Sequence, residues 1–157
     1  MSEKFTDVEF TQTEAGYYDL QLDDVGDFEK TNSFDTAILL SLFCERRASV
    51  TEVPESSRRR GWIGNIGQPV EYGSKLWLLE QARLTLSTVN AARDYLKQSL
   101  AWLVNLDYLK AVNVETSRNI ETNALIAKVT LIRFDDKVET KNFVLWENTG
   151  SGLTRRA

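Results

Sequence analysis

The hydrophobic period of this chain changes near residue 105, and that change constrains the fold more than any single motif. Within residues 86–104, apolar side chains recur at spacings of three and four, at Val89, Ala92, Leu96, Leu100 and Leu103. Within residues 112–146, three runs alternate apolar and polar side chains, with turns near 118–119 and 135–137. A long helix before an antiparallel meander predicts an α+β fold, in which a small antiparallel sheet packs against two to three helices.

The first half of the chain predicts further elements. Residues 34–47 predict a buried helix, because Asn32 or Ser33 can serve as its N-cap and the Arg46-Arg47 pair suits its C-terminal end. Residues 74–83 predict a short helix that packs on the first, after which Thr85 caps the long helix. Residues 17–22 alternate like a half-buried strand.

Length and composition predict one domain. The chain has 157 residues, of which 42% are hydrophobic and 27% charged, as in ordinary globular proteins. We expect an N-terminal arm at 1–16, one domain at 17–148 and a frayed tail at 149–157. No apolar run approaches the roughly 20 residues that span a bilayer, and the start lacks a secretory pattern. We therefore expect a soluble cytoplasmic protein without a membrane partner.

The absence of histidine excludes several kinds of chemistry. It removes Ser-His-Asp and Cys-His catalysis and the commonest metal ligand, and we expect no cofactor. The net charge of −4 disfavours nucleic acid, although basic runs such as 58–60 could form a local patch. The single cysteine, Cys44, lies in an apolar run, which favours a buried inert thiol over a nucleophile.

Paired carboxylates could in principle cleave glycosides. The candidates are Asp19, Asp23, Asp24, Asp27, Glu45 and Glu71. Nothing in their spacing singles out a pair, and acidic residues on turns and solvated faces explain them better. The glycines at 61, 64 and 67 are not followed by the Gly-Lys-Ser/Thr of a phosphate loop.

Residues 58–79 are dense in Arg, Gly and Trp, which predicts an ordered recognition loop. The arginines at 58–60 suit either a solvated loop or buried pairing and stacking, which the adjacent Trp62 makes possible. Trp77 and Trp102 suit core positions better than binding positions.

Four blocks carry a family resemblance: FDTAILLSLFCERRA, RRGWIG, YGSKLWLLEQARLT and SLAWLV. In this order, and before a β-rich tail, they resemble the Mu-like phage short baseplate proteins, counterparts of the gene-25-like sheath initiators of contractile tails. The likeness spans residues 17–134. Two departures are Ile63, where the family often has a second Trp, and Asn65, where it often has Asp.

The resemblance implies a gene-25-like fold and a non-enzymatic structural protein at the rim of a phage tail baseplate. Such a protein joins wedge subunits around the tail tube and initiates sheath assembly. Its partners would be wedge proteins, the sheath, and tube or hub proteins, with six copies in a ring in the virion after assembly in the host cytoplasm. A lysozyme-like glycosidase is the alternative, because the wider group has carried that label.

The resemblance also implies site residues. The carried-over positions are Arg59, Arg60, Gly61, Trp62, Gly73, Leu76 and Trp77. A Glu-Pro-Arg signature of the wider group falls near Glu45, Pro69 and Arg46 or Arg47. Residues 138–146 form the last run of the meander, so we expect an open edge there that accepts an arm of the sheath, with Phe143, Leu145 and Trp146 available for its side-chain pockets.

Overall fold

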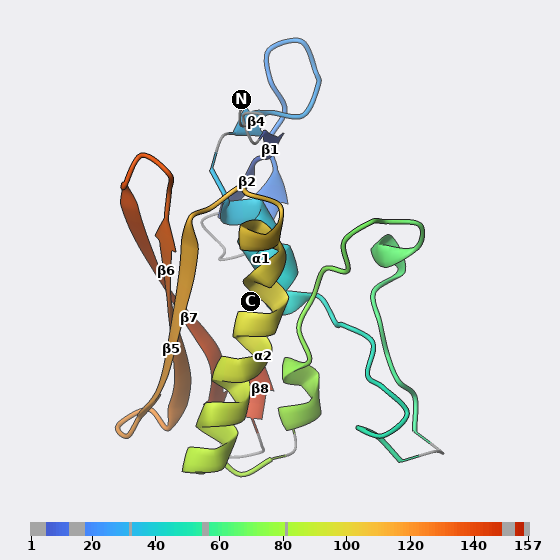
Figure 1. The fold of residues 1–157 in the computed structure, drawn as a ribbon, viewed down its shortest axis with the longest axis vertical. Coiled ribbons are helices and arrows are strands. Elements are labelled where there is room, and N and C mark those ends of the chain that lie inside the picture. The colour runs from blue at the N-terminus through green and yellow to red at the C-terminus, as the bar shows by residue number, and fades with distance from the viewer. Residues whose placement is uncertain are drawn as a thin grey trace.

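A long helix, α2 (Leu86–Asn105), lies against one face of a four-stranded antiparallel sheet (Figure 1). The structure is a computed structural model and describes residues 6–12, 18–31, 33–54, 57–80, 82–148 and 153–155. The predicted apolar stripe of α2 faces the sheet, since Val89, Ala92, Leu96, Leu100 and Leu103 are all buried. Thr85 caps the helix by accepting a hydrogen bond from the backbone N–H of Thr88. The predicted helix and its cap are confirmed.

The sheet contains the predicted meander. Its strands are β5 (Ala111–Asn119), β6 (Ala124–Ile132), β7 (Val138–Asn148) and β8 (Leu153–Arg155), in that order. In β6 every second side chain from Leu125 to Leu131 is buried against the helical layer, as a two-residue period requires. The first turn lies at 120–123, slightly later than predicted. Strand β8 is an addition to the prediction, and it pairs with the end of β7.

The first helix, α1 (Asp35–Phe43), is shorter than predicted. Cys44 turns to extended backbone, because its carbonyl accepts a hydrogen bond from the N–H of Ser74. Arg46 and Arg47 therefore lie in the following loop and not in the last helical turn. At the other end, the N-cap position is Phe34 and makes no side-chain capping hydrogen bond, so the expected cap at Asn32 or Ser33 is wrong; the Ser33 hydroxyl accepts from the Asp35 N–H at 3.2 Å one residue before the cap. Cys44 is half-buried, where a buried thiol was expected.

Four short strands precede α1. Strands β1 (Asp7–Val8) and β4 (Lys30–Thr31) pair with each other, and β2 (Phe10–Gln12) pairs with β3 (Tyr18–Leu20). The strand expected at 17–22 is thus β3, but Leu20 and Leu22 are exposed, so the expectation of a half-buried strand is wrong. Within the expected arm, residues 7–8 form β1 and residues 10–12 form β2. Positions 1–5 and 13–16 of the arm, and 149–152 and 156–157 of the expected tail, lie outside the described residues, and the domain limits stay a prediction.

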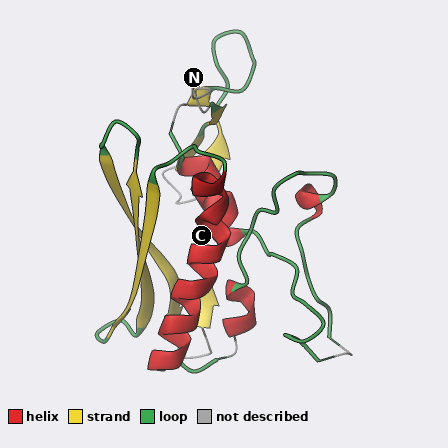
Figure 2. Cartoon of the chain, in the orientation of Figure 1, coloured by secondary structure: helices red, strands yellow, loops and turns green. Residues whose placement is uncertain are grey.

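A long excursion of mostly loop connects α1 to α2 and stands beside the helical layer (Figure 2). It contains two 3-10 turns, η1 (Ile63–Asn65) and η2 (Leu76–Leu79). The predicted short helix at 74–83 is therefore a single 3-10 turn. The α+β class, with a small antiparallel sheet and two α-helices, is confirmed. No helix in the described ranges is long and apolar enough to cross a membrane.

Candidate functional site

The base of the excursion is fixed by a close backbone approach. The N–H of Arg46 donates to the Ser74 carbonyl, and the Ser74 N–H donates to the Cys44 carbonyl, both at 2.9 Å. Ser74 also donates its hydroxyl to the last-turn carbonyl of Leu42 at 2.6 Å. Gly73 allows this contact, because its φ is +102° and a Cβ there would lie 2.8 Å from the Cys44 oxygen. Gly73 was expected to bind a partner, and this close backbone contact explains why a glycine stands at the position.

Arg60 ties three parts of the excursion together. Its guanidinium donates to Glu45 at 2.7 Å and to Glu80 at 3.1 Å, and it lies over the Trp77 ring at 4.7 Å. The hydrogen bond to Glu80, followed by that to Glu45, raises the pKa of Arg60 above its ordinary value. The residue holds an unusual φ of +48°, which these contacts stabilise. Of the two interpretations of the arginine run, pairing and stacking describe Arg60.

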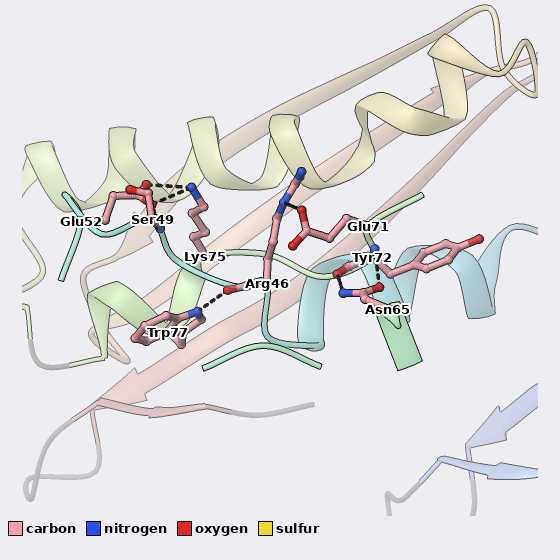
Figure 3. Close-up of polar contacts among 8 residues, drawn as sticks. All are labelled: Arg46, Ser49, Glu52, Asn65, Glu71, Tyr72, Lys75 and Trp77. Carbon is pink, nitrogen blue, oxygen red and sulfur yellow. Dashed lines mark hydrogen bonds and ion pairs between the residues drawn. The ribbon is translucent and has the colours of Figure 1, made fainter. Parts of the chain in front are cut away.

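The outer part of the loop is closed by a side-chain amide. Asn65 donates from Nδ2 to the Tyr72 carbonyl and accepts from the Tyr72 N–H through Oδ1, both at 2.8 Å (Figure 3). Tyr72 packs edge-to-face against Trp62 on one side and Trp102 of α2 on the other. Trp62 folds over Gly64, where a Cβ would lie 2.4 Å from the indole ring. The loop is therefore ordered from its base to its tip.

The tip of this ordered loop exposes apolar side chains. Ile63 is 79% exposed and Ile66 is 78% exposed, on either end of η1. The contacts described above hold the backbone on both sides of them. Sequence reasoning missed Ile66 and treated Ile63 only as a departure from a family pattern. A pair of isoleucines beside three glycines within 61–67 was the available signal.

A cleft of about 780 Å³ separates the excursion from α2. Arg46, Arg47, Arg59 and Lys75 line it on the loop side together with Glu71, and the α2 side includes Gln98, Trp102 and Leu106. Arg46 pairs with Glu71 at 3.0 Å, and Lys75 pairs with Glu52 at 2.8 Å (Figure 3). The pairing with Lys75 lowers the pKa of Glu52 to about 2. We call this cleft the basic cleft.

The remaining expected partner residues differ in exposure. Leu76, Leu145 and Trp146 are buried in the core, and Trp77 is nearly so, with its indole N–H donating to the Arg46 carbonyl at 2.9 Å. Phe143 is half-buried and packs edge-to-face on Phe43. Because Leu145 and Trp146 are buried in the hydrophobic core, neither side chain is open to a partner's pockets in this fold. Arg59 donates Nε to the Ala48 carbonyl, and Gly61 lies against Arg47.

The expected edge at 138–146 is free over part of its length. Strand β7 pairs with β6 on one side, and β8 covers its other side only at residues 146–148. The β7 backbone before Trp146 has no second strand partner within the described residues.

The candidate carboxylates do not form an enclosed pair. Asp19 lies in β3, and Asp23, Asp24 and Asp27 lie between β3 and β4, all of them exposed. Glu45 and Glu71 are paired with Arg60 and Arg46. Burial raises the pKa of Asp7, which the sequence did not single out. Among the described residues, no group of three His, Cys, Asp or Glu side chains could hold a metal ion.

A family model described as phage protein GP46 matches residues 34–138 of this chain. This chain belongs to the GP46 family. The matched segment contains α1, the excursion with its loop and basic cleft, α2, β5 and β6. The prediction of a Mu-like phage baseplate protein family is confirmed.

Two curated relatives show the same likeness. Baseplate protein gp46 of Escherichia phage Mu is 37% identical over 89 residues, which cover 55% of this GP46 family member and 61% of the Mu protein. Mu-like prophage FluMu protein gp46 of Haemophilus influenzae is 30% identical over 113 residues, 71% of this chain and 77% of the relative. The first match thus spans about three fifths of the Mu protein.

Proposed function

We propose that this chain is a non-enzymatic structural component of a contractile phage tail baseplate, where it joins wedge subunits around the tube and initiates sheath assembly. The observation that carries the proposal is the likeness to Mu gp46, which is named as a baseplate protein. In this proposal six copies form a ring in the virion, with wedge proteins, sheath, and tube or hub proteins as partners. The chain passes through the host cytoplasm during assembly.

The tip of the ordered loop is the proposed contact with a wedge protein. A flexible loop loses conformational entropy when it binds a partner. The backbone of this loop is already fixed by the contacts around Arg60, Asn65 and Gly73. Ile63 and Ile66 can therefore bury apolar area at little further ordering cost. The carried-over residues Arg59, Arg60, Gly61, Trp62, Gly73, Leu76 and Trp77 then serve the contact by holding the tip in place.

The test is whether a phage that carries Ile63→Asp with Ile66→Asp incorporates the variant chain into its baseplates. We expect a folded variant with wild-type thermal stability that is missing from purified baseplates. Leu86→Asp with Ile120→Asp is the matched control, since these side chains are 78% and 84% exposed outside the loop. Normal incorporation of the tip variant would refute the proposed wedge contact, and absence of the wild-type chain from baseplates would refute the function as a whole.

The free part of the β7 edge is the proposed site of sheath initiation, where an extended arm of the sheath adds as a further strand. The Arg133 N–H donates to the Lys137 carbonyl. Hydrogen-bonded and non-hydrogen-bonded pairs alternate along an antiparallel ladder, and the Arg133–Lys137 bond makes the odd-numbered residues of β7 the hydrogen-bonded ones. The N–H groups of Thr140 and Asn142 therefore point away from β6, toward the free edge.

Asn142→Pro tests this edge, because it removes an outward donor and leaves the ladder to β6 in place. We expect baseplates and tubes that contain the variant while the sheath fails to polymerise. Lys141→Pro is the contrasting variant, since its N–H points into the ladder and its loss should destabilise the monomer itself. Normally sheathed tails with Asn142→Pro in the baseplate would contradict the proposed docking edge.

A further inference from the structure

The basic cleft carries cationic charge that the described part of the chain does not neutralise. Arg46 and Lys75 have carboxylate partners in Glu71 and Glu52. Arg47 is exposed and has no hydrogen bond or ion pair from its side chain among the residues that the structure describes. Arg59 donates to a neutral backbone carbonyl. The cleft therefore presents two arginines with unmatched charge beside the half-buried Trp102 and the exposed Leu106.

A hairpin that precedes α1 has the opposite charge. Residues 19–30 contain five carboxylates (Asp19, Asp23, Asp24, Asp27 and Glu29) and one cation, Lys30, which lies 3.8 Å from Asp27. The turn is ordered by Asp23, whose side chain accepts from the backbone N–H groups of residues 25 and 27. Its apolar side chains are exposed, with Val25 at 87% and Phe28 at 44%. We call residues 19–30 the acidic hairpin.

The two surfaces match in charge, in apolar content and in form. A narrow projecting hairpin with an excess of carboxylates can enter an open cleft with unmatched arginines, and Val25 and Phe28 can cover Trp102 and Leu106. Figure 1 shows the hairpin projecting from the end of the molecule where the N-terminus lies, and the excursion standing beside α2. In this view (Figure 1) the hairpin projects away from the body of the molecule, so the cleft stays open to the hairpin of a second copy.

We propose that the acidic hairpin of one copy docks into the basic cleft of a second copy of this chain. Two different surfaces then meet, so the contact is head-to-tail and repeats from copy to copy, closing into a ring where the rotation allows. The inference deepens the proposed function, because it supplies the contact between neighbouring copies in the ring. It rests on that function only for the ring, and the contact itself is a property of the purified chain.

The test uses two charge reversals that leave internal contacts intact. Asp24→Lys alters the hairpin and Arg47→Glu alters the cleft, and neither wild-type side chain has a hydrogen bond or ion pair within the described part of the chain. Glu121→Lys and Arg83→Glu are the matched controls, with the same changes in net charge at exposed positions elsewhere. Each protein is checked by thermal unfolding and then measured by sedimentation velocity over a concentration series at low and high salt.

The expected result is a wild-type chain whose mean mass rises above 17.9 kDa with concentration, and less so at high salt because exposed charges are screened. Each reversal alone should weaken association by about tenfold or more, since it replaces a local attraction by a local repulsion and lowers the charge of one surface, while the controls behave as wild type. An equimolar mixture of the two reversed variants should associate again. In that mixture the reversed hairpin can meet the reversed cleft, and the unaltered hairpin can meet the unaltered cleft, so both kinds of contact are complementary.

Several results would overturn the inference. They are a wild-type chain that stays monomeric at the highest concentration reached, association that neither reversal weakens, and a mixture that fails to restore association. The inference would also be overturned if the wild-type chain is monomeric and the Arg47→Glu variant is missing from baseplates. The cleft would then bind an acidic segment of a different protein. The proposed function survives each of these outcomes, because incorporation of the Ile63 and Ile66 variant tests it separately.

Discussion

Gly73→Ala should destabilise the fold strongly, because Gly73 supports the approach of the excursion to the end of α1. The residue has a φ of +102°, and a Cβ would lie 2.8 Å from the Cys44 oxygen and 3.0 Å from the Arg46 nitrogen. Both atoms are backbone and take part in the hydrogen bonds that join Ser74 to this segment. They cannot move away without loss of those bonds.

The magnitude has two parts. A side chain in the left-handed region costs about 1–2 kcal/mol, and crowding of a packed site adds about 1–3 kcal/mol. Gly73→Ala should therefore lower the free energy of unfolding by about 2–5 kcal/mol. Gly67→Ala isolates the first part, because Gly67 has a φ of +76° with nothing within 4 Å of its Cβ position.

Urea unfolding of wild type, Gly73→Ala and Gly67→Ala, followed by tryptophan fluorescence and circular dichroism, measures both parts. Thermal unfolding gives a second measure, at about 2–4 °C per kcal/mol for a chain of this size. We expect Gly73→Ala to be less stable than Gly67→Ala by the cost of crowding. Equal stability of the two variants would refute the steric reasoning and leave partner contact as the role of Gly73.

Three further predictions concern single side chains. Asn65→Asp should lose about 1–3 kcal/mol at pH 7, because a carboxylate cannot donate to the Tyr72 carbonyl, and a urea series should show the deficit shrinking as that carboxyl is protonated in acid. Lys75 lowers the pKa of Glu52 to about 2, so the stabilisation from this ion pair is present above the ordinary pKa of 4.5 and is lost as the pH falls toward 2. In Glu52→Gln, the free energy of unfolding from the same urea series should therefore decrease less over this pH range. Trp146→Ala should cost about 3–5 kcal/mol in the same assay, and a smaller loss would show that this buried ring is not part of the core.

Local pattern was sufficient for the elements whose partners are adjacent in sequence. Helix α2 follows from a hydrophobic period of 3.6 residues, and its cap follows from the Thr85 hydroxyl, which accepts a hydrogen bond from the N–H of Thr88, three residues later. The meander follows from the two-residue period, since strands joined by short turns pair with their neighbours. The ordered loop within residues 58–79 could be located because Gly, Arg and Trp cluster there, but its contacts could not be assigned.

The family resemblance pointed to residues that the structure places in contacts within the chain. Arg60, Gly73 and Trp77 were expected to bind a partner, and the structure gives each an internal contact with a residue far along the chain. Arg and Trp suit an interface and a folded loop equally well, and sequence carries no information on which side of the loop they face.

The sequence by itself determined the α+β class, the long helix, the meander and the position of the loop, because each depends on residues within a few positions of one another. Only the tertiary structure decided where α1 ends, since Cys44 turns to meet Ser74, which lies far later in the chain. It also decided which apolar side chains are left outside. Ile63 and Ile66 are as hydrophobic as Leu145, and only the packing of distant segments buries one and exposes the others.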